Sequence, residues 1–68
     1  MNGWTLIYTT RNSAEANILK GMLEENQVPV MVMNKQDSSY LNFGDIEIYA
    51  PQHLQELAKR LINKALLN

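Results

Sequence analysis

The sequence predicts an α+β fold, a ferredoxin-like split β-α-β-β-α sandwich that spans residues 1–68 as a single domain. Three observations lead to this prediction. Periodic segments follow one another in the order strand, helix, strand, strand, helix. A strand–helix–strand unit crosses over right-handed and leaves room for the third strand between the first two. Pro29 cannot donate a ladder hydrogen bond, which places the second strand at a sheet edge. We therefore expect a three-stranded antiparallel sheet in the order 1-3-2, with two helices on one face.

The first strand and the first helix are indicated by composition and capping. Residues 4–9, WTLIYT, are rich in β-branched and aromatic types and predict a strand. Asn12 precedes Glu15 by three positions, the spacing of a capping box at a helix start. We expect Asn26 to end this helix, because asparagine accepts the left-handed conformation of a helix cap. The predicted apolar stripe consists of Ile18, Leu19, Met22 and Leu23.

The second half of the chain predicts two strands and a helix. Residues 28–33, VPVMVM, form the second strand, and residues 46–50, IEIYA, form the third with clean alternation. Between them, residues 34–45 are polar and turn-forming, and we call them loop 34–45. Pro51 suits the first turn of the last helix. The apolar stripe of that helix consists of Leu54, Leu57, Ala58, Leu61, Ile62, Ala65 and Leu66.

Size and composition exclude several classes of protein. A chain of 68 residues buries only roughly 60% of the surface that its unfolded form exposes, so its core is marginal. With no cysteine and one histidine, a disulfide scaffold, a zinc finger and a thiol nucleophile are excluded, and we expect no cofactor. The net charge of −1 provides no basic stripe for nucleic acid. The sequence shows neither a signal peptide nor a membrane-spanning stretch, so we expect a cytoplasmic protein.

Catalytic groups are few. His53 is the single histidine and falls in the first turn of the predicted last helix. Asp37, Ser38 and Ser39 share a loop, but a Ser-His-Asp relay needs the histidine to reach them in space. No phosphate-binding glycine motif is present, and the acidic residues lack the spacing of a calcium loop. We expect that the protein is not an enzyme.

Loop 34–45 is the strongest candidate for binding a protein partner. At twelve residues it is long for a connection between neighbouring strands, and long loops in compact domains are often functional. It mixes charged, hydroxyl and aromatic side chains, a composition suited to recognition. In the alternative interpretation, its apolar residues fold back as a lid over the core or over the sheet. The predicted partner-binding residues are Lys35, Asp37, Ser38, Ser39, Tyr40 and Phe43.

The sheet face away from the helices is the second candidate. Alternation in the strands leaves apolar side chains on this face, and no helix covers them. The first strand also lacks charge and proline, and the fold offers no fourth strand beside it. We therefore expect a homodimer, with a trimer as the alternative and a monomer if loop 34–45 covers the face. The predicted self-association residues are Trp4, Leu6, Tyr8, Met31, Met33 and Tyr49.

Two segments carry a resemblance to a known family. The run NKQDSSYLNFGDIEIY at residues 34–49 and the preceding MLEENQVPVMVMN at residues 22–34 resemble a family of small proteins described as prokaryotic signal-transducing proteins (domain-of-unknown-function family two thousand and seven). The resemblance implies a ferredoxin-like fold similar to that of trimeric nitrogen-regulatory signalling proteins. In those proteins the loop that corresponds to loop 34–45 engages partners. The sequence has no counterpart of their nucleotide-binding residues and lacks their later strands.

Three functions follow from these observations. The first is a non-enzymatic interaction module that uses loop 34–45 and the open sheet face in signalling or regulation. The second is a sensor that binds a nucleotide or another metabolite at a subunit interface. The third is a small hydrolase that uses Ser38 or Ser39 with His53.

Overall fold

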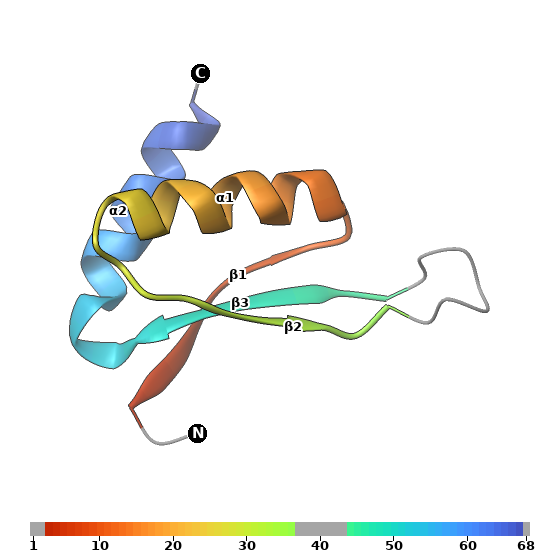
Figure 1. The fold of residues 1–68 in the computed structure, drawn as a ribbon, viewed down its shortest axis with the longest axis horizontal. Coiled ribbons are helices and arrows are strands. Elements are labelled where there is room, and N and C mark those ends of the chain that lie inside the picture. Colours follow the sequence, from red (N-terminus) through yellow and green to blue (C-terminus); the bar gives the residue numbers. More distant parts are fainter. Residues whose placement is uncertain (1–2, 37–43, 68) are drawn as a thin grey trace.

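The computed structural model describes residues 3–36 and 44–67. Its strands form one antiparallel sheet in the order β1-β3-β2, and both helices lie on the same side of it (Figure 1). This confirms the predicted α+β class, element order and strand order. The elements are β1 (Trp4–Thr10), α1 (Ser13–Glu25), β2 (Met31–Asn34), β3 (Ile46–Pro51), the 3₁₀ helix η2 (Gln52–Leu54) and α2 (Gln55–Leu66).

The hydrophobic core lies between the sheet and the two helices. Inward-facing Ile46, Ile48 and Ala50 of β3 are buried beneath both helices. The stripes of the helices are narrower than predicted, because the helices have a sheet on one side and solvent on the other. Ile18 of α1 is 69% exposed, and Leu57 of α2 is 40% exposed. The buried core consists of Ile7, Ala16, Leu19, Leu23, Val28, Ile46, Ile48, Ala50, Ala58 and Ile62.

Helix α1 begins as predicted and ends differently. The side chain of Asn12 accepts a hydrogen bond of 3.0 Å from the backbone N–H of Glu15, which confirms the N-cap. Asn26 caps the C-terminus, but its φ is −97°, and the left-handed residue is Gln27 with φ 61°. The predicted conformation of Asn26 is therefore wrong. Its side-chain amide donates a hydrogen bond of 2.8 Å to the carbonyl of Met22, and the reversal of the chain falls one residue later, at Gln27.

A β-bulge interrupts the alternation of β1. The register against β3 shifts between Leu6 and Tyr8, so Ile7 and Tyr8 both face the helices. The Tyr8 hydroxyl donates a hydrogen bond of 3.1 Å to Glu15 of α1. Strict alternation predicted Tyr8 on the open side of the sheet, and that placement is wrong because the extra residue of a bulge reverses the side chains that follow it.

The two prolines lie at strand ends. Strand β2 is an edge strand, as predicted, but it begins at Met31, beyond Pro29, which has no N–H for the ladder. Pro51 is the last residue of β3 and precedes η2, so the final α-helix begins at Gln55 and not at Pro51. The turn of η2 lies between the end of the central strand and α2.

Candidate interaction surface

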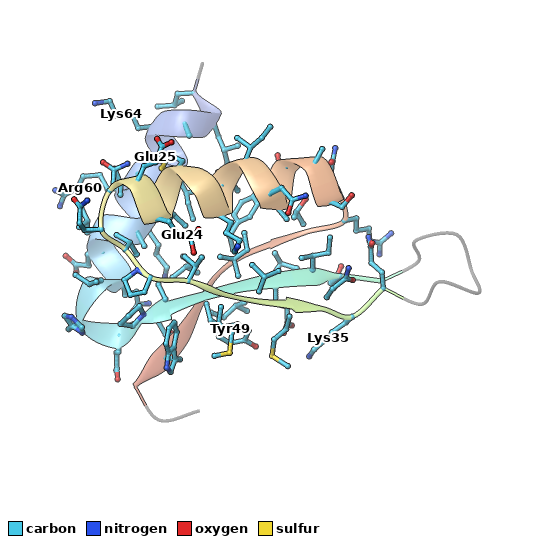
Figure 2. All side chains as sticks on the ribbon, viewed as in Figure 1. Glu24, Glu25, Lys35, Tyr49, Arg60 and Lys64 are labelled. Carbon is cyan, nitrogen blue, oxygen red and sulfur yellow. The ribbon has the colours of Figure 1, made fainter. Side chains whose placement is uncertain are left out.

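Strand β3 divides its side chains between the two faces of the sheet. Ile46, Ile48 and Ala50 are buried under the helices, whereas the residues between them are half-buried on the opposite face. Figure 2 shows Tyr49 and Lys35 on that opposite side, directed away from both helices. We call this side the open face. By register with β3, and by alternation before the bulge, it consists of Trp4, Leu6, Thr9, Met31, Met33, Glu47, Tyr49 and Pro51.

The open face is largely apolar. One row across the three strands brings Leu6, Tyr49 and Met31 together, and we call it the apolar row. Leu6 is 42% exposed, and Met33, two residues further along β2, is 40% exposed. Trp4, the first residue of β1, lies beyond the apolar row. The predicted self-association residues therefore gather on one surface, with the exception of Tyr8. Apolar surface that is partly exposed across a whole sheet face is typical of interfaces.

A small polar cluster lies beside the apolar row. The carboxylate of Glu47 accepts a hydrogen bond of 2.8 Å from the Tyr49 hydroxyl, and the Lys35 ammonium lies 3.2 Å from the same oxygen. The Glu47 side chain is only 17% exposed. The hydrogen bond from Tyr49, followed by that from Lys35, lowers the pKa of Glu47. The same contacts with Glu47 raise the pKa of Tyr49 and of Lys35. This cluster holds a carboxylate on an apolar face with its charge already compensated.

The base of loop 34–45, residues 34–36 and 44–45, is held by hydrogen bonds. The backbone N–H of Lys35 donates 2.8 Å to the carbonyl of Asp45. The side-chain amide of Gln36 donates 2.7 Å to the carbonyl of Arg11, which links the loop base to the turn after β1. Gly44 has φ +121°, and a Cβ atom there would lie 2.7 Å from the Lys35 carbonyl oxygen. The two chain segments therefore approach more closely than any residue other than glycine allows.

Charges of both signs project from this loop base. Arg11 and Asp45 form an ion pair of 3.6 Å with side chains that are 72% and 52% exposed. The side chain of Lys35 is 56% exposed. Of the predicted partner-binding residues, the structure places Lys35 at the loop base. Asp37, Ser38, Ser39, Tyr40 and Phe43 lie outside the described residues.

The structure does not bring His53 next to the base of loop 34–45. His53 is an exposed residue of η2 and follows the Pro51 end of β3, whereas loop 34–45 joins β3 at its Ile46 end. Within residues 3–36 and 44–67, no group of three or more His, Cys, Asp or Glu side chains could hold a metal ion. In the same ranges, neither α-helix is long and apolar enough to cross a membrane.

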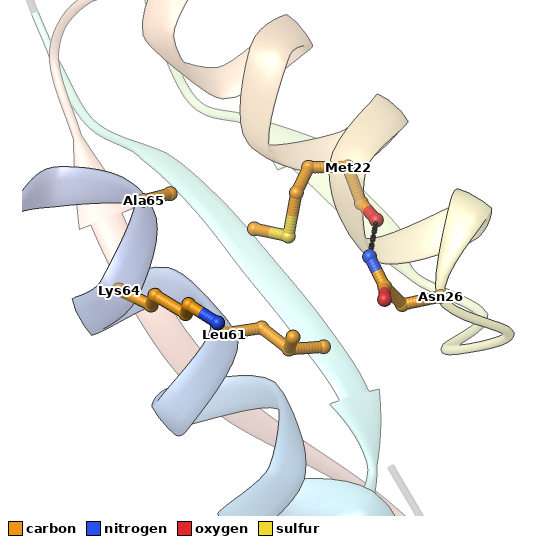
Figure 3. A pocket seen from close by; sticks show the side chains of 5 residues that line it. All are labelled: Met22, Asn26, Leu61, Lys64 and Ala65. Carbon is orange, nitrogen blue, oxygen red and sulfur yellow. Dashed lines mark hydrogen bonds between the residues drawn. The ribbon is translucent and has the colours of Figure 1, made fainter. Parts of the chain in front are cut away.

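A groove between the two helices was not predicted from the sequence. Figure 3 shows it between the C-terminal part of α1 and α2. Its volume is about 270 Å³. The residues that line it are Met22, Asn26, Leu61, Lys64 and Ala65. The lining is apolar apart from the amide of Asn26 and the ammonium group of Lys64. The two helix stripes indicated which residues would be apolar, but not that their flanks would leave a space between the helices. The volume is just below the ~300–1,000 Å³ of typical small-molecule sites.

The fold and this surface define a class: a small β-α-β-β-α module with helices on one face of the sheet and no described segment over the other. The family model described as "Putative prokaryotic signal transducing protein" matches residues 4–65, and the chain belongs to this family. The match confirms the resemblance found in residues 22–49. No curated protein and no solved structure matches the chain.

Proposed function

We propose that this chain is a non-enzymatic interaction module of cytoplasmic signal transduction that binds a protein partner through loop 34–45 and associates with itself through the open face. The family description supports a role in signalling. The observation that carries the proposal is the loop base, where a fixed backbone presents exposed Arg11, Lys35 and Asp45 beside the loop.

A fixed base favours recognition for an energetic reason. Ordering a free loop on binding costs conformational entropy, and a base already held by backbone and Gln36 hydrogen bonds reduces that cost. The charges of both signs at the base then orient a partner, because charge complementarity contributes to specificity and to the rate of association. Lys35 has donors that are not used by Glu47 and can bind an acidic group of the partner.

The competing functions receive less support from the described residues. The metabolite sensor would bind at a subunit interface, whereas the groove between α1 and α2 lies within one chain. A hydrolase that uses His53 would need its serine to reach η2, which follows the far end of β3 from the loop. Neither function explains the charged loop base.

The proposal is tested by partner capture with matched charge reversals. Tagged wild-type protein, Lys35→Glu and Lys20→Glu are used to capture partners from extracts of the native cell, and the captured proteins are quantified by mass spectrometry. Lys20 pairs with Glu24 on α1 at 3.9 Å and is 46% exposed, so its reversal changes the net charge equally, away from the loop base. We expect Lys35→Glu to reduce capture of the specific partner about tenfold, the equivalent of ~1.4 kcal/mol, and Lys20→Glu to retain it.

Two results would contradict the proposal. If both variants capture the partner as well as the wild type does, the loop base is not the binding site. If both lose it equally, the interaction depends on net charge and not on the loop base. Circular dichroism of each variant establishes that the fold is retained.

A further inference from the structure

We propose that a second copy of this chain covers the open face, and that the two sheets pack face to face about a two-fold axis that crosses the strands at the apolar row. The inference rests on the self-association in the proposed function and assigns it a surface and a symmetry. In this dimer Leu6, Met31 and Tyr49 each lie opposite the same residue of the second copy, and the strands of the two sheets run in opposite directions.

The composition of the open face favours a second copy of this chain as its binding partner. The apolar row carries no charge, so it can pack on itself without repulsion, as a two-fold interface requires. The carboxylate nearest to this row, Glu47, is already bound by Tyr49 and Lys35. Burying Glu47 at an interface therefore leaves no unpaired charge. An unpaired charge is what makes burial of ionised groups costly. A marginal core of 68 residues also gains from the added apolar burial.

The direction of the axis follows from the distribution of charge along the strands. The open face is apolar toward the Trp4 end and charged at the loop base. An axis along β3 would place Glu47 over Glu47 of the second copy, and Lys35, which follows β2, over Arg11, which follows β1. Like charges in direct opposition destabilise an interface. An axis across the strands at the apolar row avoids both contacts and leaves the two loop bases at opposite ends of the dimer.

This symmetry has a consequence for binding. Each loop base projects beyond the shared apolar row, and the two point in opposite directions. The dimer therefore presents two separate partner sites, one at each end, and not one composite site. Partner binding should be independent at the two sites, with one partner for each chain.

The first test is the oligomeric state of the purified protein. Sedimentation equilibrium of the wild type over micromolar to millimolar concentrations should show a reversible transition to twice the 7.8 kDa chain mass. Leu6→Lys places two ammonium groups in opposition at the axis and should abolish the transition. Leu57→Lys on α2 changes a side chain of similar exposure, 40% against 42%, and should leave it intact. A wild type that stays at the chain mass, or a dimer that withstands Leu6→Lys, overturns the proposal.

The second test determines the axis by cross-linking. The chain has no cysteine, so single-cysteine variants react at one site only. Under the proposed symmetry, Leu6→Cys lies about 10 Å from its counterpart, the distance between packed sheets. Met33→Cys, two residues beyond the apolar row, is separated from its counterpart by a further ~13 Å along the strands. A short bis-maleimide linker should therefore join Leu6→Cys dimers and leave Met33→Cys chains single. Equal yields for the two variants, or none for Leu6→Cys, contradict this axis.

The two proposals fail separately. A monomeric wild type that still captures its partner through Lys35 refutes the dimer and retains the proposed function. A dimer that cross-links at Leu6 but shows no Lys35-dependent capture retains the interface and refutes the loop base as the partner site.

Discussion

The two faces of the sheet differ although one strand supplies both. In β3, Ile46, Ile48 and Ala50 are at most 2% exposed beneath the helices, whereas Glu47 and Tyr49 alternate with them on the open face. The covered face is apolar because folding requires it. The open face is apolar although no helix among the described residues covers it, and exposed apolar surface of this kind is typical of sites of association. The comparison separates residues that determine stability from residues that are available for binding.

The largest expected effect comes from the covered face. Ile48 is fully buried at the centre of the sheet, and Ile48→Ala should lower the free energy of unfolding by about 2–5 kcal/mol through lost burial and the cavity left behind. Because such a loss can exceed the stability of a small core, Ile48→Val, at about 0.5–1.5 kcal/mol, provides a folded intermediate case. Urea unfolding followed by circular dichroism measures both. If Ile48→Val lowers the free energy of unfolding by less than Leu6→Ser on the open face does, the two faces do not differ in their contribution to stability.

A smaller loss is expected at the loop base, where the open face meets loop 34–45. Gly44→Ala adds a Cβ 2.7 Å from the Lys35 carbonyl oxygen at a residue with φ +121°, and we expect a loss of about 1–3 kcal/mol. Gly3→Ala is the matched control, because Gly3 has φ +81° but no atom within 4 Å of the added Cβ. Urea midpoints should rank wild type above Gly3→Ala and Gly3→Ala above Gly44→Ala. Equal losses would mean that the backbone angle alone, and not the close approach, constrains the loop base.

Local sequence was sufficient to predict most of the covered face. The alternation of IEIYA predicted the buried side of β3, and Asn12 with Glu15 predicted the start of α1. The strand order 1-3-2 followed from chain connectivity, and the edge position of β2 followed from Pro29. These features depend on residues close together in the chain, where periodicity and capping preferences apply directly.

Several of the features that were missed depend on contacts between distant segments. The bulge that turns Tyr8 toward Glu15 exists only in the pairing of β1 with β3, so no pattern within β1 reveals it. Gln36 reaches the carbonyl of Arg11 across 25 positions, and this bond helps to hold the loop base. Alternation predicted that Glu47 and Tyr49 face outward, but their link to Lys35 requires the fold.

A gain in stability is expected on the solvent side of α1. Gly21 lies within the helix with no atom within 4 Å of an added Cβ, so Gly21→Ala should raise the free energy of unfolding by about 0.5–1 kcal/mol. The substitution strengthens a helix on the covered side of the sheet and leaves the open face unchanged. Thermal unfolding should show a higher midpoint, with partner capture and the dimer transition unchanged. A shift in either of the latter would show that the helix layer contributes to binding.

The smallest effect is expected from Glu47, the carboxylate of the open face. The hydrogen bonds from Tyr49 and Lys35 lower its pKa in the folded protein, so the cluster stabilises the fold above the unfolded pKa near 4.5 and loses that contribution as the pH falls through the folded value. Because Lys35 is largely exposed, solvent screens the pair and the contribution is modest. Urea midpoints of the wild type and Glu47→Gln, measured from about pH 6 down to about pH 3, should therefore differ most at the upper end and converge at the lower end. Glu47→Gln keeps the shape of the side chain, so the difference between the two proteins reports the charge of Glu47. Two curves that stay parallel would show that the ionisation of Glu47 adds no stability to the fold.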